Sequence, residues 1–563
     1  MAPQLQINQG PQDALLFDNT RSYFTNVGYV RTSNFQMELR DVDPQNTANL
    51  GATVNFVIPK AADLLGPCDL MIKFNQVEEA PAPGCIWGWV ESVGYAMIEK
   101  ITFSVGSHDI ETLTGDHLNI MNELMRSDSH RYGFHHVLKT GRPLAKGQDS
   151  GMSGHMYWVD EDLDSGSYDR VIATRTATRS IIKQGKELII PLGLFFCAHP
   201  SKYFPLAAIA GSNDVRISVK FRTIPELLQA KGEPVVGTNG LDVGSPSSDS
   251  GASSIKFKNG SAFQSGGCFL RCHYIHVTGP EATALMNREH VRLMKLWHGN
   301  EVSKQFEVKC TAAGSLQTLD VDLSFLHPVQ ELIITIRKVS DMGSSVKTDI
   351  APGDDAKPVA NTAHDKSYFT YHGAGRGDPN MDTLFNTFEG EKGDLVAGTT
   401  LKTKTFTLKI NGQTRHLDGQ GVDRNYLMNR LMPMLHSNTS TLYEQIYDGS
   451  QIQGLAYDQN NDTTSRPQYG GDWNALKELV DRKEIYVYPF ALNPEGANPS
   501  GSVNFSKVSH AKLSIAVEGI LGQTTSGPLG SDQSENDTFQ VDVYGIYYNW
   551  LAIKDGRALT SFA

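Results

Sequence analysis

Apolar residues in this chain recur at every second position. In Val215–Phe221, four apolar side chains alternate with Arg216, Ser218 and Lys220. Because successive side chains of a β-strand point to opposite faces, this pattern predicts a strand with one face on a core. The same alternation occurs at 101–105, 319–325, 406–410 and 539–543. The run at 406–410 leads into Asn411-Gly412, a favoured two-residue hairpin turn.

Helical periodicity is rare by comparison. The best helical patterns are three short segments, at 115–127, 224–230 and 280–292. Strands without regular intervening helices predict antiparallel sandwiches rather than a doubly wound α/β sheet. The predicted fold class is therefore all-β, with a few short helices.

The length of the chain favours two domains. It has 563 residues, whereas single hydrophobic cores stop growing at roughly 250–300 residues. The two halves also resemble each other. The apolar segment around Pro191 has a counterpart around Pro489, and the same offset (489 − 191 = 298) carries Val215 and Ile217 onto Leu513 and Ile515. We interpret this as a duplicated β-domain.

A domain boundary is predicted at 223–262. Within it, the segment 237–254 is rich in glycine and serine and has no periodicity, which is typical of a linker or long loop. Two further polar stretches, about 340–400 and 436–475, lie between strand patterns. We interpret these as long surface loops inserted into the second domain.

Charge and hydropathy exclude several functions. The chain has 50 Lys and Arg against 62 Asp and Glu, a net charge of −12, whereas broad nucleic-acid binding needs a basic face. The longest apolar run, 188–198, contains Pro191 and Gly193 and is shorter than the ~20 residues of a spanning helix. The first residues, MAPQLQINQGPQD, predict neither a secretory signal nor myristoylation.

The six cysteines form no CxxC pair. They are too sparse for a disulfide scaffold, so we expect them to be mostly reduced and buried. A bridge or half of a metal site at Cys268 and Cys272 is the alternative.

No catalytic motif is present. The chain has no nucleophile elbow, phosphate-binding loop or zinc-protease helix, so no catalytic, cofactor-binding or metal site is predicted. Three weaker patterns favour ordinary surface roles. Asp160, Asp162 and Asp164 have the spacing of a calcium loop, but Ser165 stands where that loop needs glycine. The other two are the tripeptide Arg-Gly-Asp at 376–378 and the adjacent pair His135 and His136.

Sequons for N-linked glycosylation are the remaining modification motif. They lie at Asn259, Asn438, Asn461, Asn504 and Asn536. Because asparagine-rich loops generate such triplets by chance, they are candidate positions only.

Twelve sequence blocks carry a family resemblance. In chain order they are GPQD (10–13), FTNVGYVRTSNF (24–35), WVESVGYAMI (89–98), GDHLNIMNEL (115–124), LIIPL (188–192), FPL (204–206), VRI (215–217), LHPVQELI (326–333), YPFAL (488–492), PSG (499–501), NFS (504–506) and YYNWL (547–551). Together they resemble the double jelly-roll major capsid proteins of nucleocytoplasmic large DNA viruses, the group of iridoviruses and phycodnaviruses.

The resemblance implies a fold of two tandem eight-stranded antiparallel jelly rolls. Residues 1–30 would be an N-terminal arm, 31–222 the first jelly roll, 223–262 the linker, and 263–563 the second jelly roll with its long loops. Three copies would form a pseudo-hexagonal capsomer of an icosahedral shell. Neighbouring capsomers, minor capsid proteins and penton proteins would be its partners, with host contacts through outer loops and no direct genome binding.

The resemblance also implies roles for individual segments. By analogy the arm docks beneath the capsomer, with Phe17, Tyr23, Phe24 and Arg31 as its contacts. The expected location is the virion shell, after assembly in the host cytoplasm or a viral factory. A minor capsid paralogue of the same fold and a carbohydrate-active double jelly roll are the alternative functions.

Overall fold

The described part of the chain consists of several ordered stretches. The computed structural model describes residues 35–75, 77–79, 85–89, 93–125, 187–232, 234–237, 240–243, 256–257, 261–277, 279–298, 302–308, 316–339, 368–369, 371, 400–414, 421–436, 485–520 and 537–561. The predicted arm at 1–30 lies outside these residues, as does most of the two stretches at 340–400 and 436–475.

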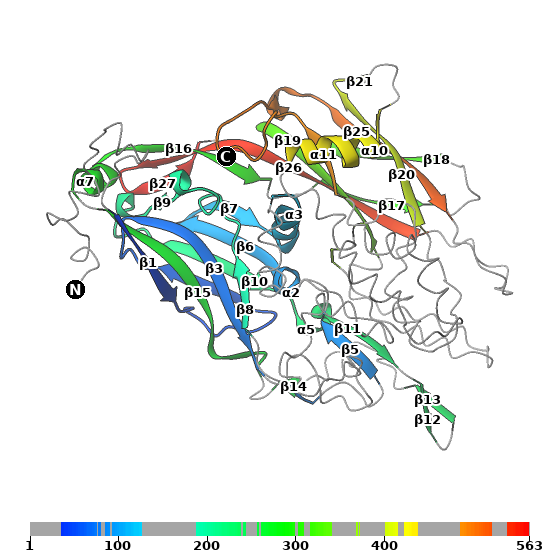
Figure 1. Cartoon of the computed structure of the whole chain (residues 1–563), viewed down its shortest axis with the longest axis horizontal. Coiled ribbons are helices and arrows are strands. Elements are labelled where there is room, and N and C mark those ends of the chain that lie inside the picture. Colours follow the sequence, from blue (N-terminus) through cyan, green and yellow to red (C-terminus); the bar gives the residue numbers. More distant parts are fainter. Residues whose placement is uncertain are drawn as a thin grey trace, which may run out of the picture.

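The first half of the chain forms a sandwich of two antiparallel sheets (Figure 1). The main path of one sheet is β1-β15-β3-β8, and that of the other is β2-β10-β6-β7. The strands are β1 (Phe35–Val42), β2 (Thr53–Ile58), β3 (Leu64–Phe74), β6 (Ile98–Val105), β7 (His108–Leu113), β8 (Glu187–Pro191), β10 (Val215–Phe221) and β15 (Phe263–Val277), with β9 (Phe204–Pro205) added beside β3. The helices are α2 (Val93–Ala96), α3 (Gly115–Met125) and α5 (Ile224–Leu227), with the 3₁₀ turns η4 (Pro200–Lys202) and η5 (Leu206–Ala208).

The second half forms another sandwich beside the first. Its main paths are β16-β26-β19-β23 and β18-β25-β20-β21. The strands are β16 (His290–Trp297), β18 (Leu316–Leu323), β19 (Pro328–Lys338), β20 (Thr400–Ile410), β21 (Gln413–Thr414), β23 (Ile485–Pro489), β25 (Ala511–Ile520) and β26 (Asp537–Lys554), extended by β17 (Val302–Val308), β22 (Val422–Asp423), β24 (Val503–Asn504) and β27 (Arg557–Thr560). The helices are α7 (Pro280–Asn287), α10 (Arg424–Tyr426), the π-helix η9 (Leu427–Leu431), α11 (Met432–Leu435) and the 3₁₀ turn η10 (Phe505–Lys507).

The two sandwiches share one topology. In each, the main paths join the first, eighth, third and sixth strands in one sheet and the second, seventh, fourth and fifth in the other. This is the jelly-roll arrangement. The predicted duplication is confirmed in position as well, because β8 and β23 differ by the offset of 298 at both ends.

The predicted domain boundary needs one correction. The predicted boundary places β15 in the second domain, but β15 pairs with β1 and β3 inside the first sandwich. The last strand of a jelly roll returns between its first and third strands, so a loop-rich segment before it is an insertion rather than a linker. Three small two-stranded ribbons also occupy this region: β4 (Val77–Glu79) with β14 (Lys256–Phe257), β5 (Cys85–Trp89) with β11 (Leu228–Gly232), and β12 (Pro234–Gly237) with β13 (Gly240–Val243).

The local predictions mostly hold. Every apolar residue of the β10 alternation is buried, and Lys220 on its other face is exposed. Asn411 and Gly412 have φ values of 51° and 79°, as the predicted hairpin turn requires. Two helices are shorter than predicted, because strand β11 begins at Leu228 and strand β16 begins at His290.

Two further findings concern the described residues alone. No helix among them is long and apolar enough to cross a membrane. They contain no cluster of three or more His, Cys, Asp or Glu side chains suited to a metal ion, and Cys268 and Cys272 are buried free thiols.

Candidate functional site: the buried contact between the two sandwiches

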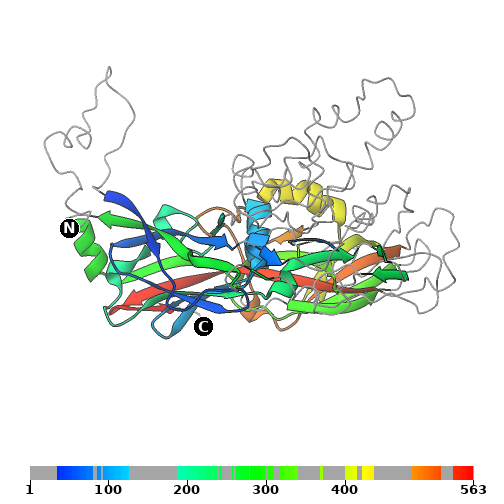
Figure 2. The same ribbon diagram turned by 90° about the horizontal axis from the view of Figure 1, so that it is seen from below.

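The two sandwiches meet through different surfaces: β7 and α3 of the first pack on the outer side of the sheet that contains β16, β26 and β19 in the second. Strand β7 of the first lies against β16 and β27 of the second, and η5 lies against α7. Figure 2 shows the two sandwiches as one extended layer, with helix α3 and the α10–α11 segment rising from the same side. Because the two contacting surfaces differ, the contact is heterologous.

Backbone hydrogen bonds cross this contact at the turn between β26 and β27. The carbonyl of Gly556 accepts from the backbone N–H of Ala210 at 3.0 Å and from Nδ2 of Asn213 at 2.8 Å. Nearby, Nζ of Lys202 donates to the carbonyl of Leu293 at 2.9 Å, and Arg292 donates to the carbonyl of Tyr203. The free edge of β16 is thus covered by loops of the first sandwich.

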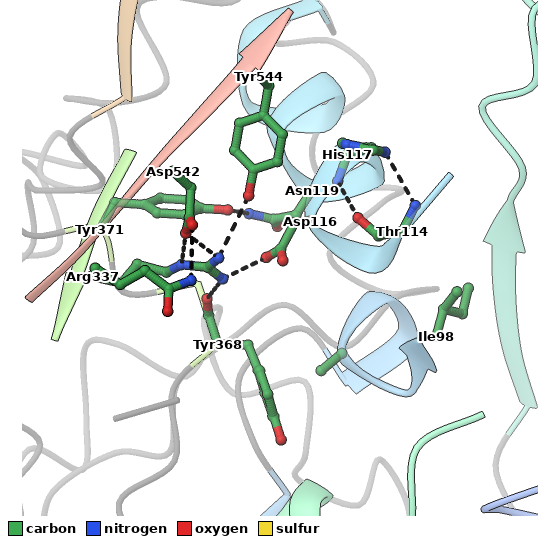
Figure 3. Close-up of polar contacts among 12 residues, drawn as sticks. Ile98, Thr114, Asp116, His117, Asn119, Arg337, Tyr368, Tyr371, Asp542 and Tyr544 are labelled. Atoms are coloured by element: carbon green, nitrogen blue, oxygen red, sulfur yellow. Dashed lines mark hydrogen bonds and ion pairs between the residues drawn. The ribbon is translucent and has the colours of Figure 1, made fainter. Parts of the chain in front are cut away.

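Arg337 of β19 forms the centre of the contact (Figure 3). Its Nη1 donates to Oδ1 of Asp116, on α3 of the first sandwich, at 2.8 Å. Its Nε and Nη2 donate to Oδ2 of Asp542, on β26, at 3.1 and 2.5 Å. Nη1 also reaches the carbonyl of Tyr368 at 3.1 Å, and the Tyr368 ring lies under the guanidinium of Arg222 at 4.3 Å.

The arginine keeps its charge although it is buried. Burial alone lowers the pKa of Arg337, but Asp116, Tyr544 and Asp542 together hold that pKa well above its ordinary value. Asp542 and Asp116 are buried as well. A cation with two carboxylates in a dry site needs close, hydrogen-bonded geometry, because each ion pays a large desolvation penalty. The cluster therefore fixes how α3 sits on the second sandwich.

An aromatic contact lies beside this cluster. The ring of His117, also on α3, stacks on Trp297 at the end of β16, with centroids 4.7 Å apart, and meets the edge of Tyr544 at 5.3 Å. Burial lowers the pKa of His117 to about 3, so its ring is neutral. Its Nδ1 accepts from the backbone N–H of Thr114 at 3.2 Å. Stacking of flat, neutral rings adds shape specificity to the contact.

Glu111 is a third buried carboxyl of this region and lies on the contacting strand β7. Its Oε2 accepts from the backbone N–H of Phe195 at 2.8 Å. Burial raises the pKa of Glu111 to about 8, although the Phe195 N–H lowers it. The folded protein therefore favours the protonated carboxyl well into the neutral range.

A separate ion cluster anchors the α10–α11 segment of the second sandwich. His436, directly after α11, contacts Oε2 of Glu331 at 3.1 Å and Oε1 of Glu495 at 3.2 Å. Burial lowers the pKa of His436, but the two carboxylates outweigh this and raise it to about 9. The positively charged ring thereby ties the end of the helix to strand β19.

Most residues singled out from the sequence lie outside the described residues. These are the arm contacts Phe17, Tyr23, Phe24 and Arg31, the sequons at Asn259, Asn438, Asn461 and Asn536, and the patterns at 135–136, 160–164 and 376–378. Asn504 is described. It is half-buried, and its side chain accepts from the backbone N–H of Ser506 at 3.0 Å to cap η10. Its glycosylation stays a prediction.

The residues of the contact itself were not found from the sequence. Asp542 alternates with Val541 and Val543, so the strand pattern places it on a solvent face, yet the other sandwich covers that face. The available signal was weak: a charged residue directly after an apolar run, such as Arg337 after LIITI in β19.

Comparisons with known proteins agree with this architecture. Residues 22–250 match the family model of the major capsid protein N-terminus, and residues 473–558 match that of the large eukaryotic DNA virus major capsid protein. The major capsid protein of Phaeocystis pouchetii virus is 23% identical over 97% of this chain and 96% of its own length. That of Chrysochromulina ericina virus is 20% identical, with 97% of each covered.

Solved structures show the same fold. The quasi-atomic model of the PBCV-1 virus capsid superposes with a TM-score of 0.56 at 15% identity, covering 96% of this chain and 100% of that one. The Faustovirus major capsid protein gives a TM-score of 0.52 at 12% identity, covering 95% and 93%. The class is thus that of double jelly-roll shell proteins. The chain belongs to the major capsid proteins of large eukaryotic DNA viruses, whose place is the capsid shell of the virion.

The close approach at Gly556 gives the first prediction. Gly556 has a φ of 72°, and a Cβ there would lie 2.4 Å from the Cβ of Ala210, whereas Gly412, with a φ of 79°, has open space around that position. Gly412→Ala should cost about 1–2 kcal/mol of unfolding free energy through backbone strain. The single variant Gly556→Ala should lose ~1–3 kcal/mol more unfolding free energy than Gly412→Ala, because the two sandwiches must also move apart. Chemical denaturation measures both, and equal losses would contradict the contact.

Removal of the buried Arg337 cation gives the second prediction. Arg337→Leu leaves Asp116 and Asp542 buried without a counter-ion, which should cost about 3–5 kcal/mol of unfolding free energy. Lys512→Met is the control, since the Lys512–Asp320 pair is 2.6 Å long but solvent-exposed. The control should lose far less, because water screens that pair. Thermal and urea unfolding test this, and a similar loss in both variants would show that the cluster is unimportant.

The raised pKa of Glu111 gives the third prediction. The unfolded carboxyl titrates near 4.5 and the folded one near 8. The unfolded state therefore loses its proton first, and stability should fall as pH rises from about 4.5 and level off above 8. Glu111→Gln keeps an acceptor for the Phe195 N–H and removes the titration. The melting temperature of this variant minus that of the parent protein should increase from pH 5 to pH 8. Below pH 4 this difference should not depend on pH. A pH-independent difference would refute this assignment.

Proposed function

We propose that the protein builds the capsid shell as a trimeric tile. Each copy contributes two jelly rolls, so three copies place six similar sandwiches around a ring and give the tile a pseudo-hexagonal outline. The role is structural rather than enzymatic, in keeping with the family to which the chain belongs. Its location is the virion shell.

One observation carries this proposal: the contact between the two sandwiches is heterologous. The side of the first sandwich that carries β7 and α3 contacts the side of the second that carries β16, β26 and β27. The equivalent outer edges at the two ends of the molecule have no match within the described residues of the copy. Heterologous contacts between similar units generate closed rings when the rotation between the units closes. Three copies with two sandwiches each supply the six units of a closed ring.

The remaining partners follow from the position of such a tile. Neighbouring tiles contact its rim, and minor capsid and penton proteins would contact its inner face and the five-fold vertices. The net charge of −12 favours protein contacts over direct contact with the genome. Long insertions on the outer side would meet the host surface.

The oligomeric state of the purified chain tests the proposal. Its mass in solution, measured by light scattering after size exclusion, should be about three times the 61.8 kDa of one chain. The trimer should form without other viral proteins, because both halves of each contact are present in the chain. A stable monomer or dimer at the concentrations used for shell assembly would contradict it.

A further inference from the structure

Strand β1 has an uncovered edge. It is the terminal strand of its sheet and pairs with β15 alone among the described strands. On its outer face Phe35, Met37 and Leu39 are 57%, 54% and 55% exposed. Natural proteins protect such edges, because unpaired backbone groups beside apolar side chains invite association. The strand therefore needs a partner.

The counterpart of β1 in the second sandwich shows what covers such an edge. Pro191 pairs with Asp69, and Pro489 pairs with Glu331, so Asp69 and Glu331 are equivalent positions. The next strand places Arg271 opposite Asp69 and Ile546 opposite Glu331.

The next strand in each sheet is the edge strand, β1 beside β15 and β16 beside β26. Asp41 lies opposite Arg271, and Trp297 lies opposite Ile546. Asp41 of β1 thus corresponds to Trp297 of β16, the residue on which His117 stacks. Within one copy, helix α3 of the first sandwich thus covers the last residue of the edge strand of the second.

The counterpart of α3 is the continuous segment from α10 to α11. Both follow the fifth strand of their sandwich and rise from the same side of the molecule (Figure 2). Both are capped by a side chain, Thr114 in one and Asp423 in the other. The third residue of α3 is His117, and the third residue of α10 is Tyr426. His117 is buried on Trp297, but Tyr426 is 52% exposed.

We propose that Tyr426 and the α10–α11 segment of one copy pack against the β1 edge of the next copy, near Asp41. The contact repeats between copies what α3 and β16 form within a copy. This inference rests on the proposed trimeric function and assigns its intersubunit surface. The anchoring of His436 to Glu331 holds the segment in place on its own sandwich.

Charge complementarity supports this pairing. Residues 423–435 contain two arginines, Arg424 and Arg430, and one acidic residue, the N-cap Asp423, so the segment has a net positive charge. The β1 side carries Glu38, Asp41 and Asp43 against two arginines, Arg40 and the Arg271 that binds Asp41 at 2.8 Å. A basic helix therefore meets an acidic strand edge.

The position of α3 excludes the wrong pairing. Asp116 and His117 of α3 are already buried against the second sandwich of their own copy. The α3 of one copy therefore cannot also cover the β1 edge of another. Alternation of first and second sandwiches around the ring follows.

Photo-crosslinking tests the contact in the assembled protein. Tyr426 is replaced by the aromatic photoreactive residue benzoylphenylalanine, and Leu316, an apolar residue on β18 that is 62% exposed, is replaced in the control. After irradiation, mass spectrometry should find Tyr426-site cross-links to residues 35–43 of a second copy, and the control should find none there. Cross-links from position 426 only to other regions would overturn the proposal.

Charge exchange tests the same contact by its energetics. Arg424→Glu with Arg430→Glu, and separately Asp41→Lys with Asp43→Lys, should each weaken trimer association at least about tenfold. The four substitutions combined should restore association. The control is Lys100→Glu with Lys507→Glu, two exposed lysines on β6 and η10, which should leave the trimer intact. Circular dichroism establishes that each variant is folded.

The outcomes separate this inference from the proposed function. If the parent protein and the charge-reversal variants are all equally trimeric, the proposed contact is wrong and the trimeric tile is unaffected. A parent protein that forms no trimer would overturn both. Loss in the single-side variants with recovery in the combination supports both.

Discussion

The architecture depends on one buried cation between two similar sandwiches. Arg337 is removed from water and must be satisfied by acceptors from both sides, which Asp116, Asp542 and the carbonyl of Tyr368 provide. Because an unpaired buried charge is so costly, this geometry permits little sliding of one sandwich on the other. The stacking of His117 on Trp297 and the close approach at Gly556 add steric precision to the same contact.

A fixed contact between unlike edges explains how a duplicated fold becomes a building block. A jelly roll alone leaves an edge strand at the limit of its sheet, and covering that strand with a second sandwich merely moves the problem to the next edge. In a chain of two sandwiches, one such edge is covered internally and one remains. In the proposed tile, closure into a ring would cover that last edge without any new kind of contact.

Much of this fold was accessible from the sequence, because the physical signals are local. Alternation identified strands such as β10, the Asn-Gly pair identified a hairpin turn, and a constant offset identified the duplication. The family blocks then gave the class of protein. Pairing partners were less accessible. β15 was assigned to the wrong sandwich, since an apolar strand pattern does not state which neighbours it will have.

The contact between the sandwiches was not predictable by the same means. Asp542 and Arg337 sit on strand faces that point away from the core of their own sandwich, which the sequence pattern assigns to solvent. Their burial arises only when the second sandwich is in place. The shortened helices have a related cause: Leu228 and His290 continue a helical pattern locally but pair as strands with β5 and β26.

The arrangement of the sandwiches is decided by a reconstruction of the assembled shell at a resolution that separates strands. We expect tiles of six sandwiches in which first and second sandwiches alternate. We also expect the contact between copies to superpose on the contact within a copy, with α10–α11 at the end of β1 as α3 lies at the end of β16. Tiles in which first sandwiches of different copies meet, or in which the β1 edge faces solvent, would contradict it.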